Sequence, residues 1–583
     1  MTALPDTAET RLPLAHLEGP PMPALEVETL PAALARAAGS HPDRTYLGFL
    51  DAKNEPTEVS FGALQAGSEA FARALLAWEL EPGERVVLLL PTGPDFLEAF
   101  FGTLLAGGVP VPWPLPLTMG RIDAYVEGTV ARIVADAGAS HCITTDRAEE
   151  SLGRVMEGLG KPGRVKTMEA LRADEAPAAD FPALSPDGLA LLQYTSGRTH
   201  LPGGVRLTHR QLLSNVAGVG QALALGEDDV GMSWIPLVHD MGLVGVLCSS
   251  LYFRFPSYVM APEAFLMRPY RWLQAISTFK ATLSAAPNFA YRLCVRRVSD
   301  RYLEGVDLSS WRLALNGAEQ VQPDSCDAFA ERFAGVGFQK SAFYPLYGLA
   351  ENALAATCPL LDRTYETYPF DATIEKGELV AASPSPEAGA PVASVGRPLP
   401  GQEIAIVDAA GELLPERHQG KIVVRGVCLM EGIHGRPERT SELKAGGWLQ
   451  TGDLGFIEDG RLFVTGRLKE MVIKMGRNYY PDDVEQVLLD AGVLEGRRVT
   501  ALATGNAESG TEDLLLVLEG PAFDEADPKA RKAFENTLSA TLLDQLGIRA
   551  DRILHLAPGH LGEGDASARR AAIRTLLREE SAA

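Results

Sequence analysis

The sequence predicts an α/β protein, because short apolar runs alternate with amphipathic stretches along most of the chain. The clearest example is an apolar run at residues 86–90, an amphipathic stretch at 95–105 and a second apolar run at 109–116. Strand, helix and strand at this spacing predict crossover connections and mostly parallel sheets. We therefore expect a large N-terminal domain in which two parallel-type sheets are packed with helices.

Before that alternation, residues 1–28 are rich in proline and polar residues, and a poorly ordered lead-in is expected there. A helix is expected to begin at Thr29-Leu30-Pro31, since proline is well tolerated in the first helical turn. The N-terminal domain is then expected to cover residues 29–466.

Two later regions depart from the alternating pattern. Residues 353–394 contain a stretch rich in Pro, Ala, Ser and Gly, which indicates an insertion. Residues 401–465 contain short alternating strands separated by Gly and Asp turns, which predict a small antiparallel or β-barrel-like subdomain. Residues 467–583 have a mixed pattern of their own and are expected to form a small α+β C-terminal domain that ends in an Arg-rich helix.

Composition narrows the class of protein. The net charge is −23, with acidic residues spread along the chain, which argues against nucleic acid and anionic membrane as main partners. Six cysteines without a CxxC pair suggest neither a zinc site nor a disulfide framework. Because the first residues lack a basic start followed by an apolar core, and no later run is long enough to cross a bilayer, a cytoplasmic protein without membrane insertion is expected.

Residues 193–205 form the most informative stretch of the chain. They follow an apolar run at residues 189–192 and precede a helix entry at Thr208-His209-Arg210-Gln211. A strand that runs into a turn rich in hydroxyls and glycine can present backbone N–H groups to phosphate oxygens. The spacing differs from that of the GxxxxGK[ST] nucleotide loop, and an isolated stretch of this kind is more often an ordinary loop.

Five further motifs follow in the chain, and together with the loop they resemble the adenylate-forming superfamily of acyl-CoA synthetases, peptide-synthetase adenylation domains and luciferases. The loop resembles that superfamily's signature, YTSGSTGxPKGV. The other segments are Trp234 to Gly242, Asn316 to Glu319, Tyr344 to Glu351, Trp448 to Asp453, and Gly466-Arg467. The resemblance covers about residues 30–500 and implies the fold described above, with a mobile C-terminal domain.

The resemblance also implies a nucleotide site. Its phosphate-binding members would be Thr195, Ser196, Gly197 and Thr199. The adenine pocket would be formed by Asn316, Gly317, Ala318 and Glu319 together with Tyr347, which stacks on the purine, and Gly348. Asp453 and Arg467 would bind the ribose, and a carboxylate suits a diol because it offers paired acceptors. Taken singly, Asp453 could equally be a turn residue and Tyr347 a core residue.

Three residues are candidates for the chemistry itself. Glu351 would hold Mg²⁺, since a carboxylate is a hard oxygen ligand. His239 would lie beside the reacting carboxylate and orient the carbonyl or act as a general base, although a hydrogen-bonded pocket histidine is the alternative. Lys469 occupies the hinge position about which the superfamily rotates its C-terminal domain, and a surface lysine is the alternative there.

Within the superfamily, the chain is most similar to the fatty acyl-AMP ligases. The segments Met260 to Trp272 and Ala286 to Cys294 are typical of that branch, and the stretch before Val395-Gly396-Arg397-Pro398 lies where the branch carries an insertion. The insertion is associated with release of acyl-AMP to a carrier protein in preference to coenzyme A.

The sequence departs from the superfamily pattern at cationic positions. Arg198 stands in place of Ser, His200 in place of Gly, and Gly203 in place of Lys. The C-terminal catalytic lysine is also missing, because the last lysine of the chain is Lys532, and Arg569 and Arg570 are the candidates to replace it. Adenylation brings negative groups together and depends on preorganised positive charge, so these losses predict a degenerate phosphate loop and impaired adenylation from ATP.

The motifs and the departures from them allow three hypotheses about function. The leading one is a fatty acyl-AMP ligase-like enzyme of bacterial-type secondary or lipid metabolism that transfers an activated acyl group to a nucleophile or carrier protein. The second is a working acyl-AMP ligase that loads a polyketide or nonribosomal peptide synthetase for natural product biosynthesis. The third is a non-catalytic adenylate-binding or scaffold protein. AMP or an acyl adenylate, with Mg²⁺, is the expected cofactor set, with ATP in doubt; the expected partners are an acyl small molecule and an acyl or peptidyl carrier protein.

Overall fold

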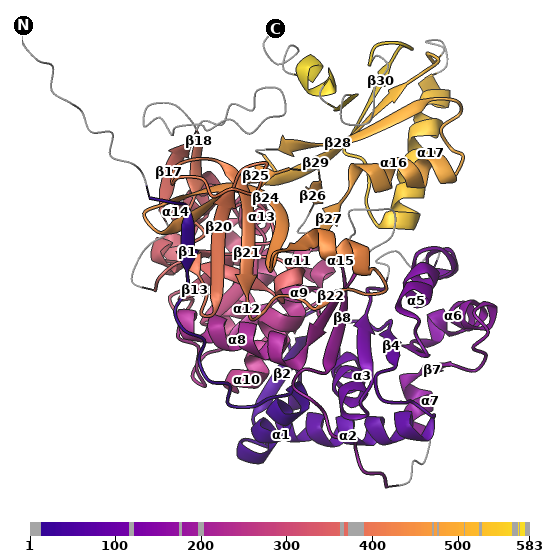
Figure 1. Cartoon of the computed structure of the whole chain (residues 1–583), viewed down its shortest axis with the longest axis vertical. Helices are drawn as coiled ribbons and strands as arrows, with labels where there is room; N and C mark the ends of the chain where they lie inside the picture. Colours follow the sequence, from indigo (N-terminus) through magenta and orange to yellow (C-terminus); the bar gives the residue numbers. More distant parts are fainter. Residues whose placement is uncertain are drawn as a thin grey trace, which may run out of the picture.

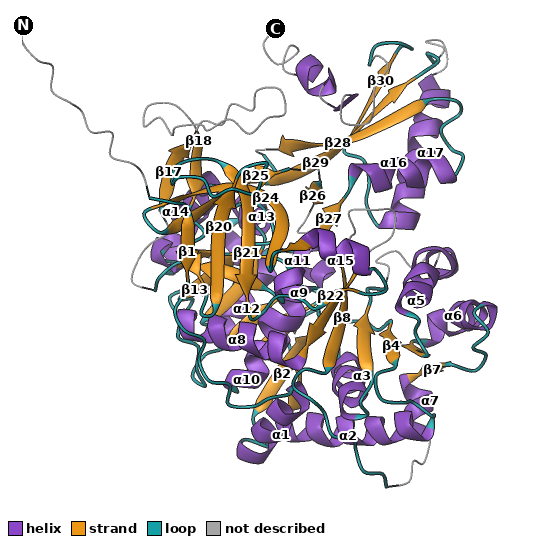
Figure 2. Cartoon of the chain, viewed as in Figure 1, coloured by secondary structure: helices purple, strands orange, loops and turns teal. Residues whose placement is uncertain are grey.

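The structure is a computed structural model, and it describes residues 13–115, 122–173, 178–195, 203–361, 366–370, 390–468, 471–474, 477–506, 508–523, 528–561, 569–570 and 572–577. The chain forms a larger body and a smaller group of C-terminal elements, which lie at the upper right of Figure 1. Helices cover the sheets of the larger body, as the prediction of an α/β fold required (Figure 2).

The larger of the two parallel-type sheets has seven strands in the order β14-β13-β12-β10-β11-β2-β3. All neighbours are parallel except the β2–β3 hairpin. The strands are β2 (Thr45–Leu50), β3 (Pro56–Ser60), β10 (Gly231–Ser233), β11 (Ser257–Met260), β12 (Leu283–Ala286), β13 (Leu313–Asn316) and β14 (Phe343–Pro345). Because parallel strands end at a common edge, Asn316 pairs with Pro345 and the two segments that follow them emerge side by side.

The connecting segments of this sheet are helical. They are α10 (Ser249–Phe253), α11 (Pro262–Met267), α12 (Tyr270–Phe279), α13 (Asn288–Arg297) and α14 (Pro323–Phe333). Strand β14 is short, because a 3₁₀ turn, Lys340–Ala342, precedes it and because it ends at Pro345, which has no N–H to extend a ladder.

The second parallel sheet has the order β5-β4-β6-β7. Its strands are β4 (Arg85–Leu88), β5 (Val109–Pro112), β6 (His141–Thr144) and β7 (Val165–Thr167). The helices around it include α2 (Phe61–Ala77), α3 (Pro94–Leu105), α4 (Ile122–Tyr125), the π-helical turn η1 (Val126–Val130), α5 (Ala131–Ala137), α6 (Asp146–Gly158) and α7 (Met168–Ala173). The strand–helix–strand unit predicted between residues 86 and 116 is therefore β4-α3-β5.

The phosphate-loop candidate lies between two strands of a third, antiparallel sheet. In this sheet β9 (Gly203–Thr208) pairs with both β8 (Leu189–Thr195) and β22 (Gly432–Ile433). Helix α8 (His209–Leu223) follows β9 directly, and Thr208 and Gln211 form a capping box at its start, as the helix-entry pattern predicted. Helix α1 (Leu30–Ser40) likewise begins where predicted, with the Thr29 side chain accepting from the N–H of Ala32.

The region 401–465 contributes to an antiparallel six-stranded sheet, whose main path is β1-β20-β21-β24-β23, with β25 paired to β24. Its strands are β1 (His16–Glu18), β20 (Gln402–Val407), β21 (Gly420–Gly426), β23 (Lys444–Ala445), β24 (Trp448–Glu458) and β25 (Arg461–Arg467). Within the stretch expected to be a poorly ordered lead-in, residues 16–18 form the edge strand β1, which pairs with β20 and satisfies its backbone groups.

Shorter elements link these sheets. They are β15 (Tyr347–Gly348), the 3₁₀ turn η6 (Ala350–Asn352), β16 (Ala355–Cys358), β17 (Thr367–Phe370), β18 (Ala390–Ala393), β19 (Arg397–Pro398) and α15 (Pro437–Leu443). Strands β17 and β18 pair within the stretch expected to be an insertion, and residues 371–389 of that stretch lie outside the described part of the chain.

The C-terminal elements have an apolar core of their own, which includes Val472, Val484, Leu516 and Leu538. The elements are β26 (Val472–Lys474), β27 (Arg477–Tyr479), α16 (Pro481–Asp490), β28 (Arg498–Asn506), β29 (Thr511–Glu519), α17 (Pro528–Leu546) and β30 (Arg552–Leu556). A separate core is consistent with the domain boundaries predicted from the sequence, which stay a prediction.

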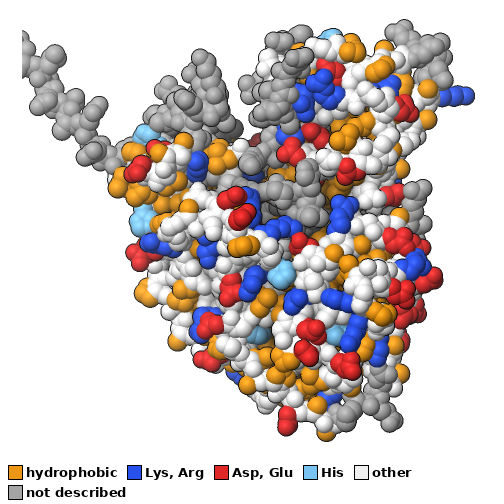
Figure 3. All heavy atoms as spheres, turned by 45° about the vertical axis from the view of Figure 1, so that its right-hand side comes forward, with side chains coloured by type: hydrophobic (Ala, Val, Ile, Leu, Met, Phe, Trp, Pro, Cys, Tyr) orange, Lys and Arg blue, Asp and Glu red, His pale blue; other side chains and the backbone are white. Residues whose placement is uncertain are grey.

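The distribution of surface charge and the state of the cysteines agree with what the composition predicted. Acidic and basic side chains are interspersed over the face in Figure 3, and hydrophobic side chains form only small patches on it. All six cysteines are buried thiols. Within the described residues, no helix has both the length and the apolar character that crossing a membrane requires.

Candidate functional site

A cavity of about 1180 Å³ lies between the larger body and the C-terminal elements. The body contributes the ends of β8 and β9, the segment 236–246, the turns after β13 and β14, and the paired strands β24 and β25. The C-terminal elements contribute α16 and residues near Gln545 and Arg574. All six motifs singled out in the sequence therefore contribute lining residues. The loop 193–205 does so through Gln193, Tyr194 and Gly203.

Tyr347, Asp453 and Arg467 form one hydrogen-bonded cluster on the cavity wall. The register of β24 and β25 places Asp453 opposite Arg467, and the Asp453 Oδ1 atom lies 2.8 Å from Arg467 Nε. The Tyr347 hydroxyl donates to Asp453 Oδ2 over 2.7 Å. Burial, and then the Asp453 charge, raise the pKa of Tyr347, which keeps this hydroxyl protonated as a donor. The cluster offers an aromatic face and a carboxylate to a ligand in the cavity.

His239 directly precedes the short helix α9 (Asp240–Gly242), and the N–H of Met241 in that helix donates to Asp240 Oδ1 over 2.7 Å. The His239 Nδ1 atom lies 2.6 Å from Asp240 Oδ1, and its imidazole lines the cavity with about a third of its surface exposed, 31%. Burial alone would raise the pKa of Asp240, but the neighbouring His239 and the N–H of Met241 hold it below its usual range. A carboxylate at Nδ1 orients the ring so that Nε2 can face a substrate.

The segment that carries His239 is anchored at both ends. Trp234 stacks on Phe265 with ring centroids 4.1 Å apart. At the other end, a side chain at Gly242 would lie 2.2 Å from the carbonyl oxygen of Pro236, so the turn tolerates only glycine. Gln193 adds a third contact by donating to the Val238 carbonyl over 3.0 Å.

Glu351 lies in η6 and lines the cavity beside Tyr347 and Gly348. Gly348 is required by packing, because a Cβ there would lie 2.0 Å from the carbonyl oxygen of Leu354. No cluster of three or more His, Cys, Asp or Glu residues suited to a metal occurs in the described part of the chain. Mg²⁺ usually takes one or two carboxylates together with water and substrate phosphates, so a single Glu351 carboxylate on the cavity wall fits that ion.

The four candidates at 316–319 have different environments. Gly317, Ala318 and Glu319 line the cavity, and Ala318 has a left-handed backbone with φ 66°. Asn316 is fully buried, and its amide donates to Asn288 Oδ1 and to the Cys326 sulfur. Its side chain therefore has a packing role, and the turn after it carries the wall of the cavity.

Glu319 joins the two parts of the molecule. Its carboxyl accepts from the N–H of Phe289 over 2.6 Å and pairs with the Thr511 hydroxyl of the C-terminal elements over 3.0 Å. Burial raises the pKa of Glu319 to about 8, with a contribution from Glu512. The residue expected in the adenine pocket therefore also contacts β29.

Several candidates lie outside the described residues or lack a described side chain. Ser196, Gly197, Thr199 and Lys469 are outside, as are the departures at Arg198 and His200, and of Thr195 only the strand backbone is described. Arg570 is described: it is 6% exposed and donates to Ala501 O, Asp482 and Glu485. Arg569 donates to Thr500 over 3.2 Å. Both arginines are engaged within the C-terminal elements in this arrangement.

Three further residues, Asp136, Tyr194 and Arg436, lie at or near the cavity and were not predicted as site residues. The Tyr194 hydroxyl donates to Asp136 Oδ2 over 2.7 Å, and Arg436 Nη2 donates to Asp136 Oδ1 over 2.7 Å. Tyr194 and Arg436 line the cavity next to Gly203. Tyr194 belongs to the signature loop, but nothing in the sequence around Asp136 or Arg436 signals the contact, since it joins residues 300 positions apart.

The cavity also has an apolar part between α8 and the seven-stranded sheet. Its lining residues are aliphatic or aromatic and include Val219, Leu223, Met232, Phe255, Leu283 and Leu315. Since apolar surface is favourable for a hydrocarbon and unfavourable for charged groups, this part suits an acyl chain.

Comparison with known proteins agrees with this geometry. A family model described as AMP-binding enzyme matches residues 34–434. The medium-chain-fatty-acid–acyl-carrier-protein ligase JamA of Moorena producens is 36% identical over 462 residues, which cover 76% of this chain and 77% of that protein. The long-chain-fatty-acid–AMP ligase FadD26 of Mycobacterium tuberculosis is 31% identical over 563 residues, which cover 91% and 94%.

Solved structures also show similarity to fatty acyl-adenylate ligases. A structure from a study of fatty acyl-adenylate ligases of E. coli and L. pneumophila has a TM-score of 0.74 and 32% identity, covering 96% of this chain and all of that one, 100%. A fatty acyl-adenylate ligase from L. pneumophila in complex with acyl adenylate and pyrophosphate also has a TM-score of 0.74, at 28% identity, covering 95% and 96%. The resemblance drawn from the motifs is confirmed: the chain belongs to the AMP-binding enzyme family of the adenylate-forming superfamily and is similar to its fatty acyl-AMP ligases.

Proposed function

We propose that this protein holds a fatty acyl adenylate in the cavity and transfers the acyl group to the thiol of a carrier protein, while forming the adenylate from ATP only slowly. The observation that carries the proposal is the cluster of Tyr347, Asp453 and Arg467 on a wall shared with the apolar part of the cavity. An adenylate needs a stacking face and a diol acceptor, and an acyl chain needs apolar surface.

The transfer step requires one proton acceptor. The carrier sulfur attacks the acyl carbonyl carbon, a C–S bond forms, the bond from that carbon to the phosphate oxygen breaks, and AMP leaves with the electron pair. His239 accepts the thiol proton and passes it to solvent, and Asp240 at Nδ1 stabilises the imidazolium that forms. Glu351 would hold Mg²⁺, and the ion would supply positive charge to a bound phosphate.

Slow adenylation is proposed from the missing cations. Gly203 provides no side-chain charge at the cavity, and no lysine follows Lys532. Arg570 lines the cavity, but its guanidinium is bound to Asp482 and Glu485, which supports a structural role. Losing one well-placed charge typically lowers a rate by about 10²–10³.

A carrier protein as acceptor is supported by the similarity to JamA, whose name states that activity. A second candidate is a fully efficient acyl-AMP ligase, which one observation favours: the Arg436 guanidinium lies beside Gly203.

Two assays on the purified chain test the proposal. ATP–pyrophosphate exchange with a series of fatty acids is expected to be slow, whereas chemically synthesised acyl-AMP is expected to acylate a phosphopantetheinylated carrier protein readily. Fast exchange would favour the efficient ligase. Acyl-AMP that binds without turnover would indicate a non-catalytic adenylate-binding protein, and acyl-AMP that does not bind would reject the proposed site.

A further inference from the structure

The apolar part of the cavity runs along the strands of the seven-stranded sheet. Ala285 and Leu315, which are register partners on β12 and β13, line it near the C-terminal edge of the sheet. Leu283 and Gly231, which are register partners on β12 and β10, line it near the N-terminal edge. Because all these strands are parallel, the apolar part extends from the edge that carries the turn at Gly317 to the opposite edge of the sheet.

An aromatic ring lies at the far end of this apolar part. Phe255 is 1% exposed and lines the cavity. A Cβ built on Gly231 would lie 3.5 Å from Phe255 Cε2, so the edge of the ring lies beside the start of β10. Phe255 belongs to the same cluster of packed apolar side chains as Leu223 of α8 and Leu283 of β12, and Leu225 packs against that cluster. Helix, ring and sheet therefore enclose the far end together.

An ion pair lies beyond the ring. Asp229, Thr282 and Arg312 each precede a strand of the sheet by one or two residues, and none of the three lines the cavity. Arg312 Nη2 lies 2.8 Å from Asp229 Oδ2, and the Thr282 hydroxyl donates to Asp229 Oδ1 over 2.6 Å. Arg312 also donates to the carbonyls of Leu223 and Ala224, over 3.0 and 3.1 Å. A hydrocarbon at this level would separate bonded charges, so the space suited to it ends before the ion pair.

The length of the strands limits how much hydrocarbon fits between the two edges. Strand β12 (Leu283–Ala286) has 4 residues, which span about 13 Å at about 3.3 Å per residue. An extended chain covers about 3.5 Å in three bonds, so about eleven bonds of an acyl chain fit in this length. This corresponds to an acyl group of about 10 to 12 carbons.

We propose that the protein selects medium-chain fatty acyl groups of about 10 to 12 carbons, and that Phe255 sets this limit by closing the apolar part of the cavity in front of the Asp229–Arg312 ion pair. The inference rests on the proposed function, which places the reacting carbonyl beside His239 at the C-terminal edge of the sheet. It deepens that function by naming the substrate class and a residue that determines specificity.

A series of synthetic acyl adenylates with 6 to 18 carbons tests the limit. Their affinities, measured by calorimetry, are expected to rise about fourfold for each added methylene up to about 12 carbons. The sixteen-carbon adenylate is expected to bind about tenfold more weakly than the twelve-carbon one, because the excess chain must displace packed side chains. Single-turnover acylation of a carrier protein should follow the same order.

Two variants move the limit in opposite directions. Phe255→Ala opens the far end, so the sixteen-carbon adenylate is expected to bind at least as tightly as the twelve-carbon one. Leu283→Phe fills the far end, so the affinity for the twelve-carbon adenylate is expected to fall about tenfold while that for the six-carbon adenylate changes less than about twofold. Leu283→Phe removes no core volume, and it tests the proposal should Phe255→Ala fold poorly.

A matched control lies two residues before Phe255. Phe253 is half-buried, and its ring packs on α8, where a Cβ built on Gly220 would lie 1.8 Å from Phe253 Cζ. Phe253 does not line the cavity. Phe253→Ala removes a phenyl ring from the same segment and is expected to leave the order of affinities across the series unchanged.

The outcomes separate the chain-length limit from the proposed function. If the wild type transfers acyl groups but binds the sixteen-carbon adenylate as tightly as the twelve-carbon one, the limit is rejected and the proposed function stands. A wild-type order of affinities in both Phe255→Ala and Leu283→Phe rejects the role of the far end. Titration with free fatty acids covers the reverse case: if they show the limit while no acyl adenylate is bound or transferred, the acyl pocket stands and the acyl-adenylate function fails.

Discussion

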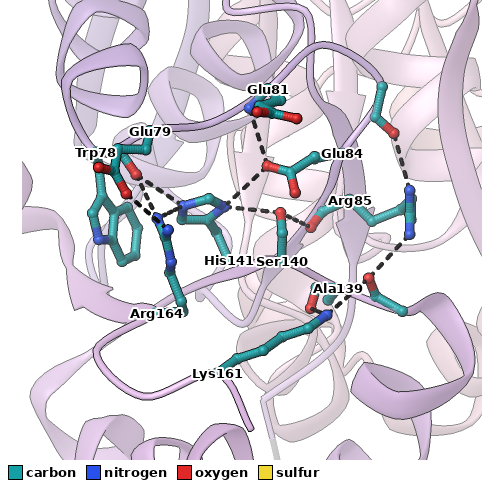
Figure 4. Close-up of polar contacts among 12 residues, drawn as sticks. Trp78, Glu79, Glu81, Glu84, Arg85, Ala139, Ser140, His141, Lys161 and Arg164 are labelled. Atoms are coloured by element: carbon teal, nitrogen blue, oxygen red, sulfur yellow. Dashed lines mark hydrogen bonds and ion pairs between the residues drawn. The ribbon is translucent and has the colours of Figure 1, made fainter. Parts of the chain in front are cut away.

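Two histidines of this protein each lie at the centre of a polar cluster, and their surroundings differ. His141, at the start of β6, is 1% exposed, and it contacts Ser140, Arg164 and the Trp78 carbonyl, with Glu84 farther off at 3.9 Å (Figure 4). His239 has the carboxylate of Asp240 at Nδ1 and lines the cavity. Both clusters combine a histidine with acidic or basic neighbours, but only that of His239 reaches a space that can hold a substrate.

The protonation of His141 follows from its environment. Arg164 Nη1 lies 2.8 Å from His141 Nε2, and burial, together with the Arg164 charge, lowers the pKa of the imidazole. Nε2 of a neutral ring can accept from Arg164, and Nδ1 lies within hydrogen-bond distance of the Ser140 hydroxyl, at 2.8 Å. Because both nitrogens are satisfied within a buried cluster, His141 stabilises the sheet and has no access to a ligand. A dense polar network is thus not by itself a sign of a site.

The largest expected effect concerns His239. Replacing it with alanine is expected to lower acyl transfer from synthetic acyl-AMP to the carrier thiol by about 10²–10⁴-fold, the usual contribution of a general base. Acyl-AMP affinity should change little. Single-turnover kinetics together with equilibrium binding distinguish the two quantities, and a loss confined to binding would make His239 a ligand-contact residue only.

Asp453→Ala comes next. It removes the carboxylate shared by Tyr347 and Arg467, so the affinity for AMP and acyl-AMP is expected to fall by about 10- to 100-fold. Fluorescence or calorimetric titration with AMP measures this change. Asp453→Asn, which keeps one acceptor oxygen, should lose less, and equal losses would argue against direct recognition of the ribose diol.

His141→Ala is expected to act on stability. Removing the buried ring takes one hydrogen-bond partner from Arg164 and one from Ser140 and leaves a cavity beside Trp78, which should reduce the free energy of unfolding by about 1–3 kcal/mol. Denaturant unfolding measures this value. At 20 °C the folded fraction should transfer acyl groups at the wild-type rate, and a selective loss of transfer would overturn the contrast between the two histidines.

The smallest effect is the pH dependence of the Glu319–Thr511 contact. The pKa of Glu319 is raised from 4.5 to about 8 in the docked arrangement, so docking is most favourable below pH 4.5, weakens as pH rises through this window and levels off above about pH 8. Small-angle X-ray scattering at pH 6.5 and pH 9 should show a slightly larger radius of gyration at the higher pH. Glu319→Gln should remove the difference, and a wild type of unchanged size would contradict the role of this carboxyl.

Local features of the sequence determined much of the fold. The alternation of apolar runs and amphipathic stretches predicted β4, α3 and β5, and the capping residues Thr29 and Thr208 predicted the starts of α1 and α8. These features depend on hydrogen bonds and side-chain periodicity within a few residues, so they can be recognised in a segment without knowledge of its tertiary contacts. The motif residues His239 and Tyr347 reach the cavity because they follow the parallel strands β10 and β14, whose ends share one edge of the sheet, whereas Asp453 reaches it from the antiparallel strand β24.

The tertiary structure alone decided which charges meet. It pairs Arg436 with Asp136 beside Gly203, buries Arg570 against Asp482 and Glu485, and turns the Asn316 amide into the core. It also satisfies both nitrogens of His141 while leaving His239 at the cavity. Apart from the contact between His141 and Ser140, these contacts join residues that are distant in sequence. The energy of a charge depends on its partner and its burial, which exist only once the sheets and helices have packed.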